Sequence, residues 1–177
     1  MWRLKQLLIS FKNLLIWLPI IWKDRDWDHT FIYDIIEFKL RKQSKHIGKL
    51  SIHGSAGKNA RDMLICANLI DKIKNGYYGL EYFDYHKSEM VFLDIEDKPG
   101  FVELEINTIS ESFDTYFKKY PIWYKRAIKH IKENQDRFTT DHNDSNLIAM
   151  IMGDLREVRA RELLFNIMNN QIESWWN

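Results

Sequence analysis

The chain has 177 residues, of which 45% are hydrophobic and 29% are charged, and it carries a net charge of +1. This balance excludes a disordered tail protein, a collagen-like repeat and a small disulfide-stapled scaffold, and the length suits one hydrophobic core. We therefore expect a single helical domain that spans residues 1–177. The one cysteine, Cys66, has no partner for an intramolecular disulfide, which favours a reducing compartment.

The small net charge hides a marked asymmetry along the chain. Residues 1–75 carry 14 Lys and Arg against 7 Asp and Glu, whereas residues 76–116 carry 2 against 10. The two parts either neutralise each other within one fold, or leave a basic surface that attracts anions and allows head-to-tail stacking. Extended nucleic acid is not an expected partner, because the acidic segment would repel a long phosphate backbone.

The N-terminal segment predicts an amphipathic helix over residues 2–18 that ends at Pro19. Its longest uncharged stretch, residues 13–22, is about half of the roughly 20 residues that a membrane-spanning helix needs. We expect this helix to pack on the core, with no membrane as a partner; binding to a membrane surface is the alternative. The expected inward stripe consists of Leu4, Leu7, Leu8, Phe11, Leu14, Leu15 and Leu18.

Two further helices are predicted in the first half of the chain. One begins near Asp28, whose carboxylate can cap it, and ends around Gly48. A glycine-marked loop at residues 53–60 precedes the other, which ends near Gly76. The expected inward face of this third helix consists of Met63, Cys66, Ala67, Ile70 and Ile73.

The period of the pattern changes in the acidic segment. Residues 89–96 and 101–107 are rich in β-favouring residues on either side of the turn signal DKPG, which predicts a β-hairpin. Helical spacing resumes at Ile109, breaks at Pro121 and ends in a long helix over residues 147–176. The predicted fold class is mainly α: a helical bundle of about five helices with one small acidic β-hairpin inserted.

The clearest candidate site is a cationic one. The sequence GSAGK at residues 54–58 lacks the full spacing of a phosphate-binding loop, but free amides at the start of the third helix can still hold an anion. The hypothesis is that Lys58 and Arg61 lie close to two arginines of the last helix in the folded protein. Together with aromatic rings, these cations would form a pocket for a phosphate-bearing ligand. The alternative is a set of solvated cations and core tryptophans. The candidate ligand-binding residues are Lys58, Arg61, Arg156, Arg159, Trp22 and Trp27.

No recognisable motif for catalysis or for a cofactor occurs in the sequence. DRDWDH at residues 24–29 resembles the opening of a calcium loop only superficially, because His29 occupies its glycine position. We therefore expect helix capping at this segment and at DHND, residues 141–144, with no metal, no cofactor and no catalytic residue. The alternative, a metal-dependent enzyme, would use Asp24, Asp26, Asp28, His29 and His142.

Three segments carry a resemblance to a known group. WKDRDWD enters the helix FIYDIIEFKLRKQSKHI, ARDMLICANLIDKIKNGYY ends in a tyrosine pair, and ELLFNIMNNQIESWWN ends in two tryptophans. These features resemble a group of small proteins of unassigned activity from tailed bacteriophages, although Asn177 stands where members of the group have an acid. The resemblance implies a phage accessory protein of the host bacterial cytoplasm that acts by binding.

The leading hypothesis combines this context with the cationic candidate site. It is a non-enzymatic accessory protein, such as a factor against host defence, that sequesters a small anionic ligand of nucleotide type or blocks a host protein. Trp175 and Trp176 add the expectation of a homo-oligomer that buries this aromatic pair. The alternative is a structural protein of virion assembly or scaffold type, whose long last helix mediates packing.

Overall fold

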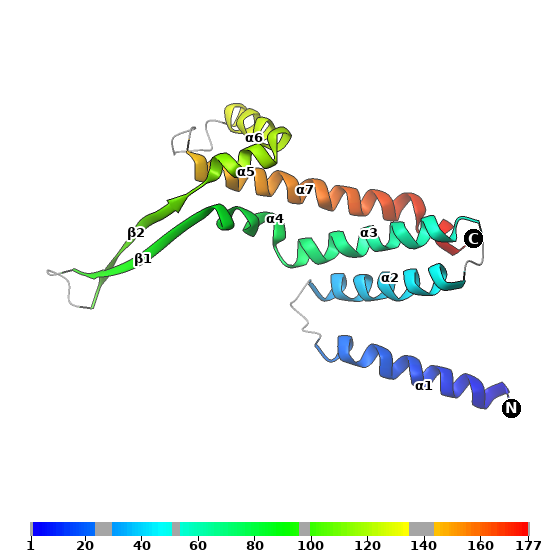
Figure 1. Ribbon diagram of the computed structural model, residues 1–177. Coiled ribbons are helices and arrows are strands. Elements are labelled where there is room, and N and C mark those ends of the chain that lie inside the picture. The colour runs from blue at the N-terminus through cyan, green and yellow to red at the C-terminus, as the bar shows by residue number, and fades with distance from the viewer. Residues whose placement is uncertain (1, 24–29, 51–53, 96–99, 135–143, 177) are drawn as a thin grey trace. The chain divides into compact units, whose positions relative to one another are not determined.

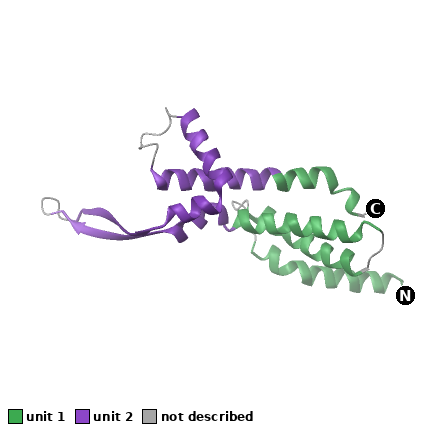
Figure 2. Ribbon diagram, turned by 45° about the horizontal axis from the view of Figure 1, so that its top comes forward, with its two compact units in different colours: residues 1–74, 163–177 green, residues 75–162 purple. Residues whose placement is uncertain are grey.

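The computed structural model shows a mainly helical protein, which confirms the predicted fold class. Its described part contains seven α-helices and one two-stranded antiparallel sheet (Figure 1). Two compact units divide the chain, one of residues 1–74 with 163–177 and one of residues 75–162 (Figure 2). We call them unit 1 and unit 2; the expected single domain stays a prediction. The residues that the structure describes are 2–23, 30–50, 54–95, 100–134 and 144–176.

Unit 1 is built around two long helices that pack side by side, α2 (Thr30–Leu50) and α3 (Ala56–Lys74) (Figure 1). The predicted inward face of α3 is confirmed, because all five of its residues are buried. The thiol of Cys66 belongs to this face, and burial, followed by the nearby Asp62, raises its pKa to about 11. The thiol therefore stays neutral and acts as a small apolar side chain. The elements of unit 1 are α1 (Trp2–Ile21), α2 (Thr30–Leu50), α3 (Ala56–Lys74), the end of α7 and a short 3-10 helix (Ser174–Trp176).

The start of α3 differs from the prediction. The helix begins at Ala56, so the expected loop over residues 53–60 is shorter than the glycines suggested. Ala56 and Ala60 are buried, and Asn59 N–H donates to the Ser55 carbonyl at 2.9 Å. Tertiary burial of these small residues thus stabilises a turn that has low helix propensity because of its glycine.

The 3-10 helix at the C-terminal side packs on α3. Asn59 Nδ2 donates to the Ser174 carbonyl oxygen at 3.2 Å, and Trp175 is only 1% exposed. One tryptophan of the terminal pair is therefore buried within unit 1 itself. This removes the reason for expecting a homo-oligomer from an exposed pair, and the homo-oligomer itself stays a prediction.

Helix α1 forms as predicted, but the expectation that it packs inward is wrong. None of its residues is buried, and the whole predicted leucine and phenylalanine stripe is exposed. It contacts α2 through an edge-to-face pair between Trp17 and Phe38, with ring centroids 4.9 Å apart. Pro19 lies inside the last turn and does not end the helix, because a proline there removes a single backbone hydrogen bond.

Unit 2 has a core of aromatic and aliphatic side chains between α5 (Phe113–Lys119), α6 (Pro121–Glu133) and α7 (Ser145–Gln171). Pro121, the predicted break, is the first residue of α6, where its missing N–H is not needed. Asp144 Oδ1 accepts the Asn146 N–H at 2.9 Å at the start of α7, which confirms a cap at the end of the DHND segment. The elements of unit 2 are α4 (Tyr77–Leu80), η1 (Glu81–Tyr85), β1 (His86–Asp94), β2 (Val102–Glu111), α5 (Phe113–Lys119), α6 (Pro121–Glu133) and most of α7 (Ser145–Gln171).

The predicted acidic hairpin is confirmed as the antiparallel pair β1 and β2. Met90 pairs with Ile106 and Phe92 with Leu104, so these four side chains share one face, whereas Glu103 and Glu105 belong to the other. The apolar face is open to solvent, with Phe92 67% exposed. The hairpin is therefore amphipathic, with its apolar side uncovered in the described structure.

The buried side of α7 differs from the predicted stripe. Leu147 and Ile151 are buried as expected, but Val158, Phe165 and Ile172 are exposed. The residues that stay buried along the helix recur at every fourth position and include a charged side chain, which a search for apolar residues passes over. They are Ile148, Met152, Arg156, Ala160 and Leu164.

The close approach of α4 to α7 generates a first prediction. A Cβ atom added to the buried Gly153 would lie 2.6 Å from the Tyr78 carbonyl oxygen, which is backbone and cannot rotate away. We expect Gly153→Ala to destabilise the protein by about 1–3 kcal/mol in urea unfolding, despite the better helix propensity of alanine. Gly48→Ala is the matched control, because its Cβ would meet only Ala60 Cβ at 3.6 Å. Equal stability of the two variants would contradict the prediction.

Candidate functional site

The candidate ligand-binding residue Arg156 lies in a buried ion network of unit 2. Its Nη1 is 2.6 Å from Glu81 Oε2 and donates to the Tyr116 hydroxyl at 3.0 Å. The guanidinium carbon lies 3.9 Å from the ring centroid of Tyr120. Both ionic side chains are at most 8% exposed. The positive charge of Arg156 is thus neutralised inside the protein.

The other oxygen of Glu81 is also fully engaged. Its Oε1 accepts hydrogen bonds from Lys119 Nζ at 2.8 Å and from the Tyr120 hydroxyl at 2.7 Å. Burial alone would raise the pKa of Glu81, but the hydrogen bonds from Lys119, Tyr120 and Arg156 lower it to about 2. The carboxylate is therefore ionised at neutral pH, and it is a weak base with its acceptor positions occupied.

This network holds four segments of unit 2 together. Glu81 starts η1, Lys119 ends α5, Tyr120 joins α5 to α6, and Arg156 belongs to α7. A satisfied buried ion pair of this kind fixes the arrangement of the elements that carry it. We therefore interpret Arg156 as a structural residue.

The remaining candidate residues lie apart from this network. Arg159 is exposed and pairs with Glu162 at 3.1 Å. Lys58 and Arg61 are exposed on α3 of unit 1, whereas both arginines belong to unit 2. Lys58 and Arg61 therefore belong to a different unit from Arg156 and Arg159, and their convergence in one site stays a prediction. Trp22 is 78% exposed at the end of α1.

Several predicted residues fall outside the described part of the chain. Trp27 is one of them, as are the aspartates and histidines of the alternative metal site: Asp24, Asp26, Asp28, His29 and His142. Among the residues that are described, no group of three or more potential metal ligands occurs.

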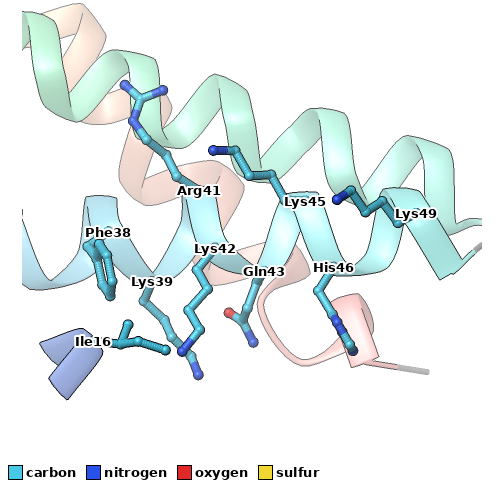
Figure 3. Close-up of a pocket in the computed structure, with 9 residues that line it drawn as sticks. All are labelled: Ile16, Phe38, Lys39, Arg41, Lys42, Gln43, Lys45, His46 and Lys49. Carbon is cyan, nitrogen blue, oxygen red and sulfur yellow. The ribbon is translucent and has the colours of Figure 1, made fainter. Parts of the chain in front are cut away.

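A different cationic site lies in unit 1, on the side of α2 that adjoins α1. It is a groove of about 780 Å³ with Ile16 of α1 on one side. Lys39, Lys42, Gln43 and His46 extend from one side of α2, as expected for positions i, i+3, i+4 and i+7 of one helix, and the side chains of Lys39 and Lys42 end near Ile16 (Figure 3). Arg41, Lys45 and Lys49 also contribute to the lining and extend on the other side of the helix (Figure 3). We call this site the α2 groove.

The acidic residues of α2 pair with Arg41 of the groove and with Lys74 of α3. Asp34 and Glu37 accept hydrogen bonds from Lys74 of α3 at 2.6 and 2.9 Å, and Glu37 also pairs with Arg41 at 2.8 Å. Within the described part of the chain, neither Lys39 nor Lys42 has an ion pair with a carboxylate. The groove therefore presents cations that are available to an external anion.

Sequence reasoning missed this site, although a signal for it was present. The segment FKLRKQSKHIGK, residues 38–49, carries five Lys and Arg and no acid. The glycines at the start of α3 resemble a phosphate loop and form the more conspicuous local pattern.

Comparisons with known proteins add no assignment. Known protein families, curated proteins and solved structures gave no match to this chain. The candidate site therefore depends on the geometry alone.

The buried network generates a second prediction. We expect Glu81→Gln to lower the free energy of unfolding by about 3–5 kcal/mol, because it leaves the Arg156 guanidinium buried without a counter-charge. The double variant Glu81→Gln with Arg156→Met should lose clearly less than the sum of the single variants in urea unfolding. Glu162→Gln, which breaks an exposed pair, is the control and should cost at most about 1 kcal/mol. Additive losses at Glu81 and Arg156 would contradict the network.

A third prediction concerns acid. The pKa of Glu81 is about 2 in the folded protein and 4.5 when unperturbed, so its contribution to stability is complete above about pH 4.5. That contribution is lost as the pH falls from about 4.5 to about 2, where the folded protein must also bind the proton. Urea unfolding across this window should show a steeper loss in the native protein than in Glu81→Gln. Parallel curves for the two proteins would contradict the assignment.

Proposed function

We propose that the protein is a non-enzymatic binding protein that holds a small phosphate-bearing ligand of nucleotide type in the α2 groove. The observation that carries the proposal is the pair of lysines on one face of α2, Lys39 and Lys42, whose side chains end near Ile16. Lysine ammonium groups bind phosphate oxygens as compact positive charges. A volume of about 780 Å³ lies in the range of small-molecule sites.

The apolar part of the groove supports a ligand with more than a phosphate. Phe38 and Ile16 lie next to the cations, and an aromatic or aliphatic surface beside charged groups suits a ligand with a flat apolar portion. The phage resemblance supports the same proposal, in which the protein sequesters a nucleotide signal in the host cytoplasm. That context rests on analogy.

A fourth prediction tests the groove against the site that the sequence suggested. In the native protein, one nucleotide from a panel of mono-, di- and cyclic nucleotides should raise the melting temperature. At about 100 times its dissociation constant it should stabilise the folded state by about 2.7 kcal/mol. We expect Lys39→Glu with Lys42→Glu to abolish this shift, because two cations are replaced by anions.

The matched control is Lys58→Glu with Arg61→Glu, which makes the same change of charge on exposed positions of α3 in the same unit. This control should keep the shift. Loss of the shift in the α3 variant alone would favour the sequence-predicted site over the α2 groove. A flat response of the native protein to the whole panel would contradict the proposed function.

A further inference from the structure

Helix α1 presents an apolar surface that unit 1 leaves uncovered. Its 20 residues include no buried residue, whereas α3 of the same unit buries eight of 19. Ten of its large apolar side chains are between 43% and 72% exposed. Contiguous exposed apolar surface of this kind marks a site of interaction. The ten residues are Trp2, Leu4, Leu7, Leu8, Ile9, Phe11, Leu14, Leu15, Leu18 and Ile21.

The charge of α1 indicates which kind of partner surface its apolar side can bind. Its charged residues are Arg3, Lys5 and Lys12, with no acidic residue in the helix. The exposed Trp2 and Trp22 stand near its two ends, and tryptophan beside basic residues is typical of helices at a membrane interface. Apolar and purely cationic surfaces together are complementary to a membrane of anionic lipids.

The helix could in principle cross a membrane or lie on one. By length and composition it is apolar enough to cross, with a mean hydropathy of 1.4 over 18 residues, but core helices and signal sequences pass the same test. Lys12 and Asn13 lie at its middle, where a spanning helix would place them in the hydrocarbon centre. Phe11 and Leu15, in contrast, belong to an apolar stripe that can enter the membrane while Lys12 stays at the headgroups. These positions favour a helix that lies on the surface.

The contact of α1 with α2 places the groove beside this helix. Trp17 packs against Phe38 edge to face, and the next residue on α1, Ile16, lines the α2 groove. Ile16 and Trp17 are half-buried, because they belong to the side of α1 that faces α2. The exposed stripe with Phe11 and Leu15 lies on the opposite side of the helix. Docking through this stripe therefore leaves the α2 groove free for a soluble ligand.

We propose that α1 docks on a membrane of anionic lipids, with its apolar stripe in the acyl region and Arg3, Lys5 and Lys12 at the lipid phosphates. This docking stands on the exposure and charge of α1, and it is independent of the ligand in the α2 groove.

The test is co-sedimentation of the full chain with vesicles of phosphatidylglycerol and phosphatidylcholine in equal parts, and with vesicles of phosphatidylcholine alone. The native protein should bind the anionic vesicles at least about tenfold more tightly, and salt should weaken the binding. Phe11→Ser with Leu15→Ser should weaken it at least about tenfold, because two apolar side chains are lost from the interface. Gln6→Ser with Asn13→Ser, polar positions of the same helix, is the control and should bind as the native protein does.

Folding is checked separately in the same variants. Since α1 has no buried residue, the melting temperature of Phe11→Ser with Leu15→Ser should equal that of the native protein. No sedimentation of the native protein with anionic vesicles would overturn the proposal. Equal sedimentation with both vesicle types, unchanged binding of the Phe11 and Leu15 variant, or light scattering that shows self-association through α1 without vesicles would also overturn it.

The two proposals fail in different ways. Nucleotide-induced melting shifts without sedimentation would sink the membrane proposal and support the proposed function. Sedimentation of the native protein with anionic vesicles, without a nucleotide response, would support the membrane proposal and contradict the proposed function. Phe11→Ser with Leu15→Ser should lose the sedimentation and keep any nucleotide-induced melting shift, because these changes lie on the side of α1 away from the groove.

Discussion

The ion pair of Glu81 with Arg156 is the constraint on which the arrangement of unit 2 depends. A guanidinium on the buried row of α7 is tolerated only with a counter-charge, and the chain supplies that carboxylate 75 positions earlier. Lys119 and Tyr120 then satisfy the second oxygen of the same carboxylate. The short segments that follow α3 are consequently fixed against α5 and α7, and the chain leaves them to form the hairpin.

The same chemistry separates the two kinds of cation in this protein. Arg156 is surrounded by partners from its own unit, so its charge serves the fold. Lys39 and Lys42 lie on a helix whose carboxylates, Asp34 and Glu37, are already engaged by Lys74 and Arg41. The number of cations in a segment therefore says little about whether it binds an anion. A cation can bind an external anion only where no carboxylate of the protein already pairs with it.

Local pattern predicted the helices and the hairpin well, because periodicity and turn chemistry act over a few residues. The inward face of α3 is an example, since Met63, Cys66 and Ile70 recur at helical spacing on one side and are all buried. The apolar stripe of α1 has equally regular helical spacing, yet none of its residues is buried. Burial requires a partner surface, and the local sequence does not show whether one exists. Arg156 illustrates the same limit of local pattern: the carboxylate that neutralises it lies 75 positions earlier, so its burial in an ion pair leaves no local signal in the sequence. The α2 groove could not be predicted in full, because it is formed by α2 together with Ile16 of the preceding helix, and the basic segment of α2 alone does not show that the two helices meet.

The discontinuity of unit 1 bears on the order of events during synthesis. Unit 2 is one uninterrupted segment, residues 75–162, and can complete its core as soon as that segment has left the ribosome. Unit 1 begins first but needs residues 163–177, and Trp175 of that stretch is 1% exposed in the finished structure. Until unit 2 has been translated, the surface of unit 1 that Trp175 covers stays exposed. Translation of unit 1 thus begins first, but its core is completed last.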